Sequence, residues 1–424
     1  TLNPPQHVSA SGTRVQGDKG ARAWYHVARE TITQKGKRPL LHVISWWLLI
    51  HLLGLAALPL AYRLFKWLPG RGYAFAKPLG LLVTSYLLWM GASLGYLRNT
   101  LGAGVVAIVA TAALSIGCYL WRRDDEPSLF AFLRDHRFMI LTVEILFAAG
   151  FLAWAGLRAY APDKIMSSGG EKFMEIAFLN ATLESTEFPP HDPWLSGFAI
   201  SYYYFGYVMM AILTRLSGVV SGVGFELYDA LTFALTVTGA FGVVHDLVAG
   251  RTPESTSDRQ PVRYGLLGSL FVAVMGNLEG LLEALYAKGV LPDRFWRWID
   301  VPNLIEAGRV TGTLYPGHGW WWWRASRVLR DRNLLGEPMP LNPIDEFPFF
   351  SFLLGDNHPH VLALPFVLLA IALALDLLRR RWRSARGRER VRPWWNPAAY
   401  TLDGDWGLFV AYALGLGALG FLNT

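Results

Sequence analysis

Residues Leu101–Trp121 read LGAGVVAIVATAALSIGCYLW and contain no charged side chain. An α-helix needs about 20 consecutive apolar residues to cross the hydrocarbon core of a bilayer. Comparable stretches recur along the chain, and each one predicts a membrane-spanning helix. The predicted spans are 41–62, 78–97, 101–121, 138–158, 197–216, 225–248, 264–284, 350–378 and 407–422. The sequence therefore predicts an all-α fold, a polytopic bundle of transmembrane helices.

The composition of the 424-residue chain supports this fold class. Hydrophobic residues make up 53% of the chain and charged residues 17%, and the mean hydropathy is +0.28. Soluble domains usually carry about 25% charged residues. The net charge of +7 does not indicate nucleic acid as a partner, because basic residues gather beside predicted helices, as between Arg379 and Arg390. Such clusters are typical of cytoplasmic loops that face anionic lipid. We expect membrane lipids as partners and a multi-pass position in the cell membrane.

Three regions follow from the distribution of polar residues. Residues 1–40 form a basic polar tail, 41–137 carry the first transmembrane helices, and 138–424 form a module with two long polar loops. These loops are 159–196 and 285–347, and we expect them to bear helices that lie in the membrane interface. The chain begins without Met and ends inside an apolar stretch, which favours a fragment or a processed half that lacks a C-terminal portion.

The sidedness of the two long loops is argued from charge. Basic residues between the first spans place the loop 159–196 on the extracytoplasmic face, by the positive-inside tendency. Counting spans would put 285–347 on the opposite face. Because both loops border candidate functional residues, we nevertheless expect them to share a face. That arrangement requires a broken or re-entrant stretch, at Gly276 or at Gly355.

Two glutamates of the first long loop are candidate catalytic groups. Glu171 and Glu175 are one helical turn apart in a segment with helical periodicity, so they can share a helix face. A carboxylate at the membrane interface can act as a general base toward a hydroxyl group. A pair of solvated acids on an amphipathic helix would give the same pattern, and periodicity alone favours that plainer interpretation.

The polar sequence that follows Gly355 is a second candidate. Asp356, His358 and His360 lie within five residues at the start of a long apolar run. Ionisable side chains at a membrane boundary are costly unless they are paired, hydrated or bound to metal. His-x-His beside a carboxylate can supply metal ligands, although a helix cap bonded to backbone groups would use the same residue types. The cluster favours a role in holding a divalent metal or orienting a phosphate, and a divalent metal is the only cofactor that the sequence indicates.

Other polar residues are candidates for binding a substrate. Arg158, Lys172 and Arg324 suit a phosphate group, arginine through its planar fork, although each one alone resembles an interfacial charge. Tyr203 belongs to a run of three tyrosines that suits a sugar or a lipid headgroup and equally an interfacial aromatic belt. Glu144 lies inside an apolar span and is expected to pair with a side chain of another helix. The candidate substrate-binding residues are Arg158, Lys172, His191, Asp192, Tyr203 and Arg324.

Several motifs together resemble a family of uncharacterised membrane proteins of bacteria and archaea, here termed the YYY type after its three tyrosines. The motifs are RAYAPD from Arg158, GEKFMEIAFLNA from Gly170, PPHDPW from Pro189, YYY from Tyr202, ASR from Ala325 and EFPFFSFLLGDNHPH from Glu346. The resemblance covers roughly residues 140–424 and leaves 1–135 unassigned.

The YYY-type family looks similar to glycosyltransferases of the GT-C class, which use lipid-phosphate sugars. This resemblance implies a GT-C-like bundle whose catalytic base is an acid in the first large extracytoplasmic loop, at Glu171 or Glu175. It also implies donor-phosphate contacts from Lys172 or Arg158. The expected function is transfer of a sugar from a polyprenyl-phosphate-type donor to an extracytoplasmic acceptor. The alternatives are a non-enzymatic integral subunit of a membrane complex, whose loops dock a partner subunit, and a transporter with discontinuous helices.

Overall fold

The structure of the chain is a computed structural model. It describes residues 39–121, 127–160, 171–250, 259–302, 304–305, 321–339, 343–384 and 406–423. Nearly all of the predicted basic tail, and the arginine-rich segment that follows Ser384, lie outside these residues.

The regular elements of the described ranges are helices, which confirms the predicted all-α fold. The first half contains α2 (Pro39–Leu64), η2 (Tyr73–Phe75), α3 (Ala76–Ser93), α4 (Leu101–Trp121), α5 (Leu129–Asp135), α6 (Arg137–Tyr160), α8 (Lys172–Glu184) and α9 (Phe205–Ser217). The second half contains α10 (Ser221–Ala249), α11 (Arg259–Ala273), α12 (Glu279–Ala287), α13 (Asp293–Ile299), α14 (Trp321–Ala325), α15 (Pro348–Leu354), α16 (Pro359–Ser384), α18 (Trp406–Gly417) and α19 (Leu419–Leu422).

Five helices in the described part of the chain are long and apolar enough to cross a membrane. They are α2, α4, α6, α10 and α16. Their apolar windows differ in burial: 83% of the window in α10 is buried inside the protein, against 33% in α2, α4 and α6. Helix α10 is therefore the centre of the bundle, packed against α6, α11 and α16, and the less buried helices have surfaces suited to lipid.

Three of the predicted spans are wrong as continuous helices. Within 197–216 the helix begins only at Phe205. The span 264–284 breaks at Gly276, which has a φ of +53°, and 350–378 breaks at Gly355, which has a φ of +70°. Hydropathy counts apolar residues, but a glycine in the left-handed region ends a helix whatever the apolarity around it. Both breaks fall at glycines that the sequence predicted as alternative positions for a break, and the sidedness of the two long loops remains a prediction.

Glu144 of α6 is bonded to three other elements inside the bundle, as predicted for a charge within a span. One carboxylate oxygen accepts from Lys77 Nζ of α3 at 2.6 Å and from the hydroxyl of Tyr73 at 2.9 Å. The other lies 2.9 Å from Nε2 of His51 on α2. Each oxygen therefore has a partner, and the cluster cross-links α2, α3 and α6.

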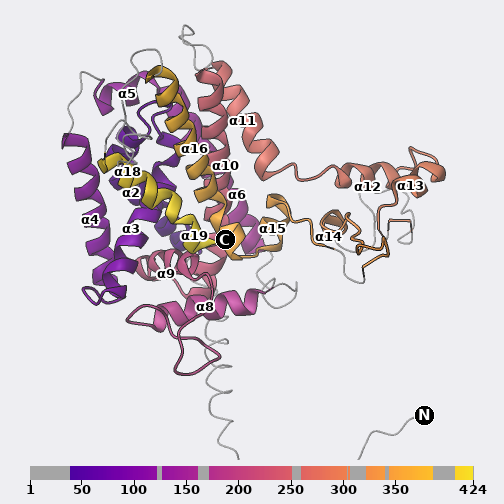
Figure 1. Cartoon of the computed structure of the whole chain (residues 1–424), viewed down its shortest axis with the longest axis horizontal. Helices are drawn as coiled ribbons and strands as arrows, with labels where there is room; N and C mark the ends of the chain where they lie inside the picture. The colour runs from indigo at the N-terminus through magenta and orange to yellow at the C-terminus, as the bar shows by residue number, and fades with distance from the viewer. Residues whose placement is uncertain are drawn as a thin grey trace, which may run out of the picture.

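Two parts stand apart from the long helices (Figure 1). Helix α8 lies across one end of the bundle, next to α9. Helices α12, α13 and α14 form an arm that extends from the side of the bundle beyond α15. The arm has a small core of its own, in which Tyr286, Trp296 and Leu304 are buried. The loop predicted at 285–347 thus contains helices, and the candidate functional site lies between α8 and the base of this arm.

Candidate functional site

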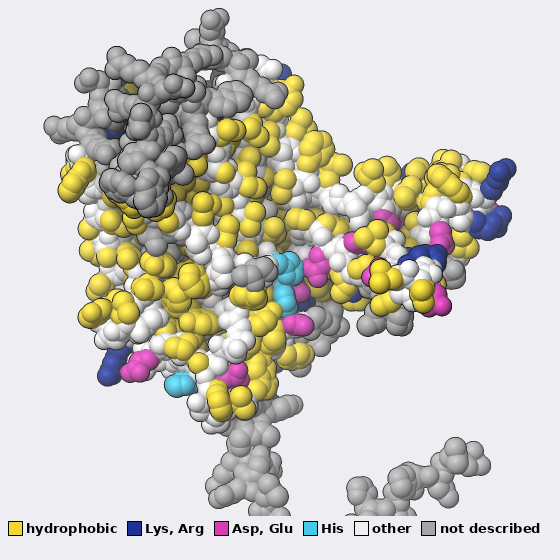
Figure 2. Space-filling model, viewed as in Figure 1, with side chains coloured by type: hydrophobic (Ala, Val, Ile, Leu, Met, Phe, Trp, Pro, Cys, Tyr) yellow, Lys and Arg dark blue, Asp and Glu magenta, His cyan; other side chains and the backbone are white. Residues whose placement is uncertain are grey.

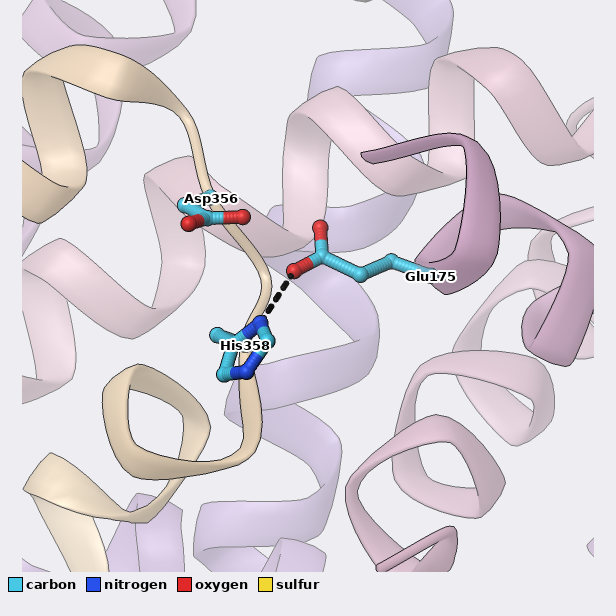
Figure 3. A group of neighbouring side chains, drawn as sticks. All are labelled: Glu175, Asp356 and His358. Atoms are coloured by element: carbon cyan, nitrogen blue, oxygen red, sulfur yellow. Dashed lines mark hydrogen bonds and ion pairs between the residues drawn. The ribbon is translucent and has the colours of Figure 1, made fainter. Parts of the chain in front are cut away.

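The broken helix α15–α16 and the crossing helix α8 bring the two predicted polar clusters together. Gly355 ends α15 in the left-handed conformation, and Pro359 begins α16. The three residues between them, Asp356, Asn357 and His358, form a non-helical link that faces α8. Glu175 lies in the first turn of α8 and points toward this link (Figure 3).

Glu175 is held by two hydrogen bonds to the link. Its Oε2 accepts from the backbone N–H of Asn357 at 3.0 Å, and its Oε1 lies 3.1 Å from Nδ1 of His358. The side-chain Nδ2 of Asn357 donates to the backbone carbonyl of Phe225 on α10 at 3.0 Å. The link is therefore fixed to α8 on one side and to the central helix on the other.

His358 connects the buried carboxylate to the outside of the site. Its Nε2 lies 3.1 Å from the hydroxyl of Tyr202 and 3.6 Å from Oε2 of Glu171. A neutral ring with its proton on Nδ1 donates to Glu175 and accepts from Tyr202, so both ring nitrogens have a partner. The side chain of Glu171 is 60% exposed, whereas that of Glu175 is fully buried. The two glutamates of one helix turn therefore have different environments.

Burial changes the protonation of the inner carboxyls. Loss of water raises the pKa of Glu175 above its ordinary value, opposed by its bonds to Asp356 and Asn357. Burial also raises the pKa of Asp356, and its proton-sharing contact with Glu175 raises that pKa further. Two carboxylates this close do not both ionise readily without a cation. In the absence of a cation, the pair is expected to retain a proton.

Two cations lie behind the carboxyls and are themselves buried. Arg158 of α6 forms an ion pair with Glu226 of α10, and its Nε lies 3.7 Å from Asp229. Lys172 of α8 is fully buried within electrostatic range of Arg158, Glu226 and the inner carboxyls, and burial lowers its pKa. A Cβ at Gly355 would lie 2.1 Å from the guanidinium of Arg158, so glycine is needed there for space as well as for conformation.

The charges around the link do not balance. Four carboxyl groups face two cations in this layer, and they are Glu175, Asp356, Glu226 and Asp229 against Arg158 and Lys172. Unpaired charge is costly in such surroundings. Electrical neutrality therefore requires two additional positive charges, which protons or one divalent cation can supply.

Glu175, Asp356 and His358 fit a divalent cation. One ligand atom from each lies within 4.8 Å of the others. Carboxylate oxygen and imidazole nitrogen are ligands for several divalent metals. The side-chain oxygens Asp356 Oδ1 and Asn357 Oδ1 are buried, and in the part of the chain that the structure describes neither has a hydrogen-bond partner. A cation would satisfy oxygens that otherwise remain unbonded.

His360 differs from the other predicted metal ligands. Its Nε2 lies 2.6 Å from Oε2 of Glu346, which also accepts from the hydroxyl of Ser351 at 3.1 Å. Its ring remains 5.3 Å from that of His358, measured between centroids. The structure thus places His360 beside the triad, at its outer rim. Figure 2 shows histidine and acidic side chains gathered where the bundle meets the arm, on a face that is otherwise largely hydrophobic.

The remaining predicted residues lie around the centre rather than in it. Arg324 donates to both carboxylate oxygens of Glu283 in the arm. The carboxylate of Asp192 accepts from two backbone amides of the following turn, and the backbone N–H of His191 donates to Ser185, so these two shape a loop beside α8. The ring of Tyr203 packs against Tyr202. Arg158 and Lys172, by contrast, lie directly behind the carboxyls, as described above.

Three residues of the site were not predicted. Tyr202 belongs to the tyrosine run, and its hydroxyl contacts His358, whereas the sequence indicates Tyr203 as the binding residue. Glu346 opens the same motif as Asp356 but lies before α15, and only the fold brings it to His360. Tyr207 of α9 is fully buried near Glu175, and among the described residues its hydroxyl has no hydrogen-bond partner. A tyrosine within an apolar helix carries no sequence signal for such a position.

The fold and the site define a class: a multi-pass α-helical membrane protein with a buried acid–histidine centre at one end of the bundle. The profile of the family described as "Uncharacterized membrane protein (DUF2298)" matches residues 83–424, and the chain belongs to that family. The match begins earlier than the resemblance at residue 140 indicated, so it includes α4 and most of α3. Searches of curated proteins and of solved structures returned no match.

Proposed function

We propose that this protein is a membrane glycosyltransferase of GT-C type, which transfers a sugar from a polyprenyl-phosphate-type donor to an extracytoplasmic acceptor. The observation that carries the proposal is the meeting of Glu175 with Asp356 and His358 at one end of the bundle. An excess of buried acid over cation, open oxygens and an exposed neighbouring carboxylate together suit a reaction centre better than a packing contact.

The geometry assigns different tasks to the two glutamates. A general base must reach the hydroxyl whose proton it removes. Glu171 is exposed and lies 3.6 Å from His358, whereas both oxygens of the buried Glu175 are bonded to the link. Glu171 is thus the base in this proposal, and Glu175 holds the link and His358 in place.

The reaction balances with these groups. Glu171 takes the proton of the acceptor hydroxyl, and the acceptor oxygen forms a bond to the anomeric carbon of the sugar. The bond from that carbon to the phosphate oxygen breaks, and its electron pair leaves with the lipid phosphate. Glu175, Asp356 and His358 would hold a divalent cation, which when bound offsets the charge of the leaving phosphate. The ring of His358, held by Glu175, lies between the outer carboxylate of Glu171 and the inner pair.

The structure gives reasons against the two alternatives. A structural subunit should pair its buried polar groups internally or cover them with a partner chain, whereas around this link four carboxyl groups face only two cations. A transporter of the broken-helix kind has its break near the middle of the bilayer. Here the part of α16 that follows the break is long enough to cross a membrane by itself, so the break lies at one end of a span.

The test measures polyprenyl phosphate, the product that every polyprenyl-phosphate sugar donor releases on transfer. The purified protein in lipid nanodiscs is incubated with Mn²⁺ or Mg²⁺ and a native extract of lipid-linked sugars, and released polyprenyl phosphate is measured by mass spectrometry. The proposal expects release that depends on the cation and disappears in Glu171→Gln. The matched control is Glu184→Gln, at the other end of α8. Release that is equal with and without the protein would overturn the proposal.

A further inference from the structure

The segment that follows α14 runs beside the segment that leads into α15. The backbone N–H of Asp345 donates to the carbonyl of Ser326 at 2.7 Å, and the N–H of Leu329 donates to the carboxylate of Asp345. This pairing places Arg327 next to Glu346, and the two side chains are within electrostatic range. A residue of the arm thereby reaches the outer rim of the acid–histidine centre.

The guanidinium of Arg327 is held in a fixed orientation. Its Cζ lies 3.4 Å from the ring centroid of Trp323, and its Nη1 bonds to the hydroxyl of Ser326. Within the described residues its hydrogen bonds involve Nη1 alone, which leaves the Nε and Nη2 donors for another acceptor. Arginine binds phosphate through two such donors, and a stacked guanidinium loses little freedom on binding.

Glu346 is within electrostatic range of Arg327 and also contacts a second donor, Nε2 of His360. The carboxylate already accepts from His360 at 2.6 Å and from Ser351 at 3.1 Å. These hydrogen bonds and the nearby Arg327 stabilise a negative charge at this position. A phosphate group offers more oxygens and more charge than a carboxylate, so it can displace Glu346 from Nε2 of His360 and accept from the remaining donors of Arg327.

The position of these groups also separates them from the inner cations. Arg158 and Lys172 are at most 4% exposed and lie behind the carboxyls, whereas Arg327 is half-buried and His360 has a side chain that is 39% exposed. A substrate that approaches from outside meets the rim first. The rim therefore suits the part of a substrate that stays bound while the bond at the centre changes.

We propose that Arg327 and His360 form a binding site for a phosphoester group, and that this group belongs to a lipid carried in the membrane. The identification of that lipid as the donor rests on the proposed function, whereas the phosphate site itself does not. Trp323, which is 44% exposed beside the guanidinium, gives the adjoining hydrocarbon chain an apolar surface.

The test measures binding of farnesyl phosphate to the purified protein in nanodiscs. Farnesol and inorganic phosphate serve as the two other probes. The wild-type protein should bind farnesyl phosphate more tightly than farnesol, and Arg327→Gln should weaken the phosphate probe by about tenfold and leave farnesol unchanged. Arg330→Gln is the matched control, because Arg330 is an exposed arginine of the same segment, paired with Asp300. Binding of inorganic phosphate alone, without preference for the lipid, would overturn the assignment to a lipid phosphoester.

A second variant tests the role of Glu346. Glu346→Gln keeps an acceptor for Ser351 and removes the competing negative charge, so farnesyl phosphate should bind more tightly. Equal binding in the wild type and Arg327→Gln, with both proteins eluting as folded particles, would overturn the site. Arg327→Lys is the control for misfolding. It keeps the positive charge and should retain part of the preference for farnesyl phosphate over farnesol. The proposed function can fail separately: an absence of sugar transfer together with an Arg327-dependent phosphate preference leaves this site intact.

Discussion

Glu144 and Glu175 are both carboxylates that lie between helices, Glu144 half-buried and Glu175 fully buried, and their surroundings differ. Glu144 has Lys77, Tyr73 and His51 on its two oxygens, so each oxygen has a partner and a full positive charge lies 2.6 Å away. Glu175 instead faces a second carboxyl, Asp356, and the two nearby cations are shared with further acids.

This difference separates a structural cross-link from the proposed reaction centre. Around Glu144 the charges and hydrogen bonds are matched by the protein alone, so the cluster can stabilise three helices without a ligand. Around Glu175 the protein provides more acid than cation and leaves oxygens of Asp356 and Asn357 unbonded within the described residues. The imbalance costs stability in the empty protein, and a ligand can recover it.

The largest expected effect distinguishes the two glutamates by activity. Glu171→Gln should lower sugar transfer by about 100-fold to 10,000-fold, because it removes the proposed general base. Glu175→Gln should also lower it strongly, through misplacement of His358. Glu144→Gln, assayed per folded molecule, should keep near-normal activity. Full activity of both α8 variants in the polyprenyl-phosphate release assay would exclude the proposed centre.

The next largest effect is on stability, and here the Glu144 cluster is expected to matter more than the Glu175 cluster. Lys77→Met removes the charge that balances Glu144 and should destabilise the protein by about 2 kcal/mol, because the half-buried carboxylate loses a charged hydrogen-bond partner. Thermal unfolding in detergent micelles checks this. Lys288→Met, at an exposed lysine, is the control. A Lys77→Met protein as stable as the wild type would mean that the cluster is not the cross-link described here.

Cation binding should belong to one cluster only. Asp356→Asn should weaken Mn²⁺ binding by at least about tenfold, as expected for loss of a charged ligand or a group next to one. Glu144→Gln should leave Mn²⁺ binding unchanged, although it too removes a carboxylate from between helices. Electron paramagnetic resonance of free Mn²⁺ gives the affinity without any activity assay. Equal affinity in the wild type and Asp356→Asn would show that the triad is not the cation site.

The smallest effect concerns Glu279 of the arm, which is buried beside Glu283 and Arg324. Burial, and then the neighbouring Glu283, raise its pKa to about 9. The folded arm thus keeps a proton that the unfolded chain loses near its ordinary pKa. The stability that this proton contributes is fully present at pH values below the ordinary pKa of a glutamate. It is lost as the pH rises through the raised pKa of Glu279.

Limited proteolysis of the arm between pH 6 and pH 10 should show this loss. Cleavage should accelerate toward the alkaline end in the wild type, and Glu279→Gln, which mimics the protonated side chain, should flatten the dependence. Glu337→Gln, an exposed acid of the arm, should leave the profile unchanged. A flat profile in the wild type would contradict the raised pKa.

Sequence patterns predicted the membrane class well and the site in part. Long apolar stretches located all five spans, although in 350–378 only the portion from Pro359 onward is one of them. Two clusters were predicted independently, at Glu175 and at Asp356–His358, and their association remained a guess. Arg324 was expected near the phosphate and instead bonds to Glu283, while its neighbour Arg327 reaches the rim. Arg324 lies on the short helix α14, and Arg327 lies three residues later, beyond its end. The two side chains therefore point to different partners, and helical periodicity alone does not predict which partner each one meets.

The sequence by itself determined that this chain is an all-α membrane protein, because the length of an apolar run and the thickness of a bilayer are local quantities. It also determined which residue types stand at the helix breaks, since glycine conformation is local as well. The tertiary structure alone decided that Glu175 meets His358, 183 residues further along the chain. Such a contact depends on how α8, α10 and the α15–α16 link pack, and packing is a property of the whole bundle rather than of any one segment.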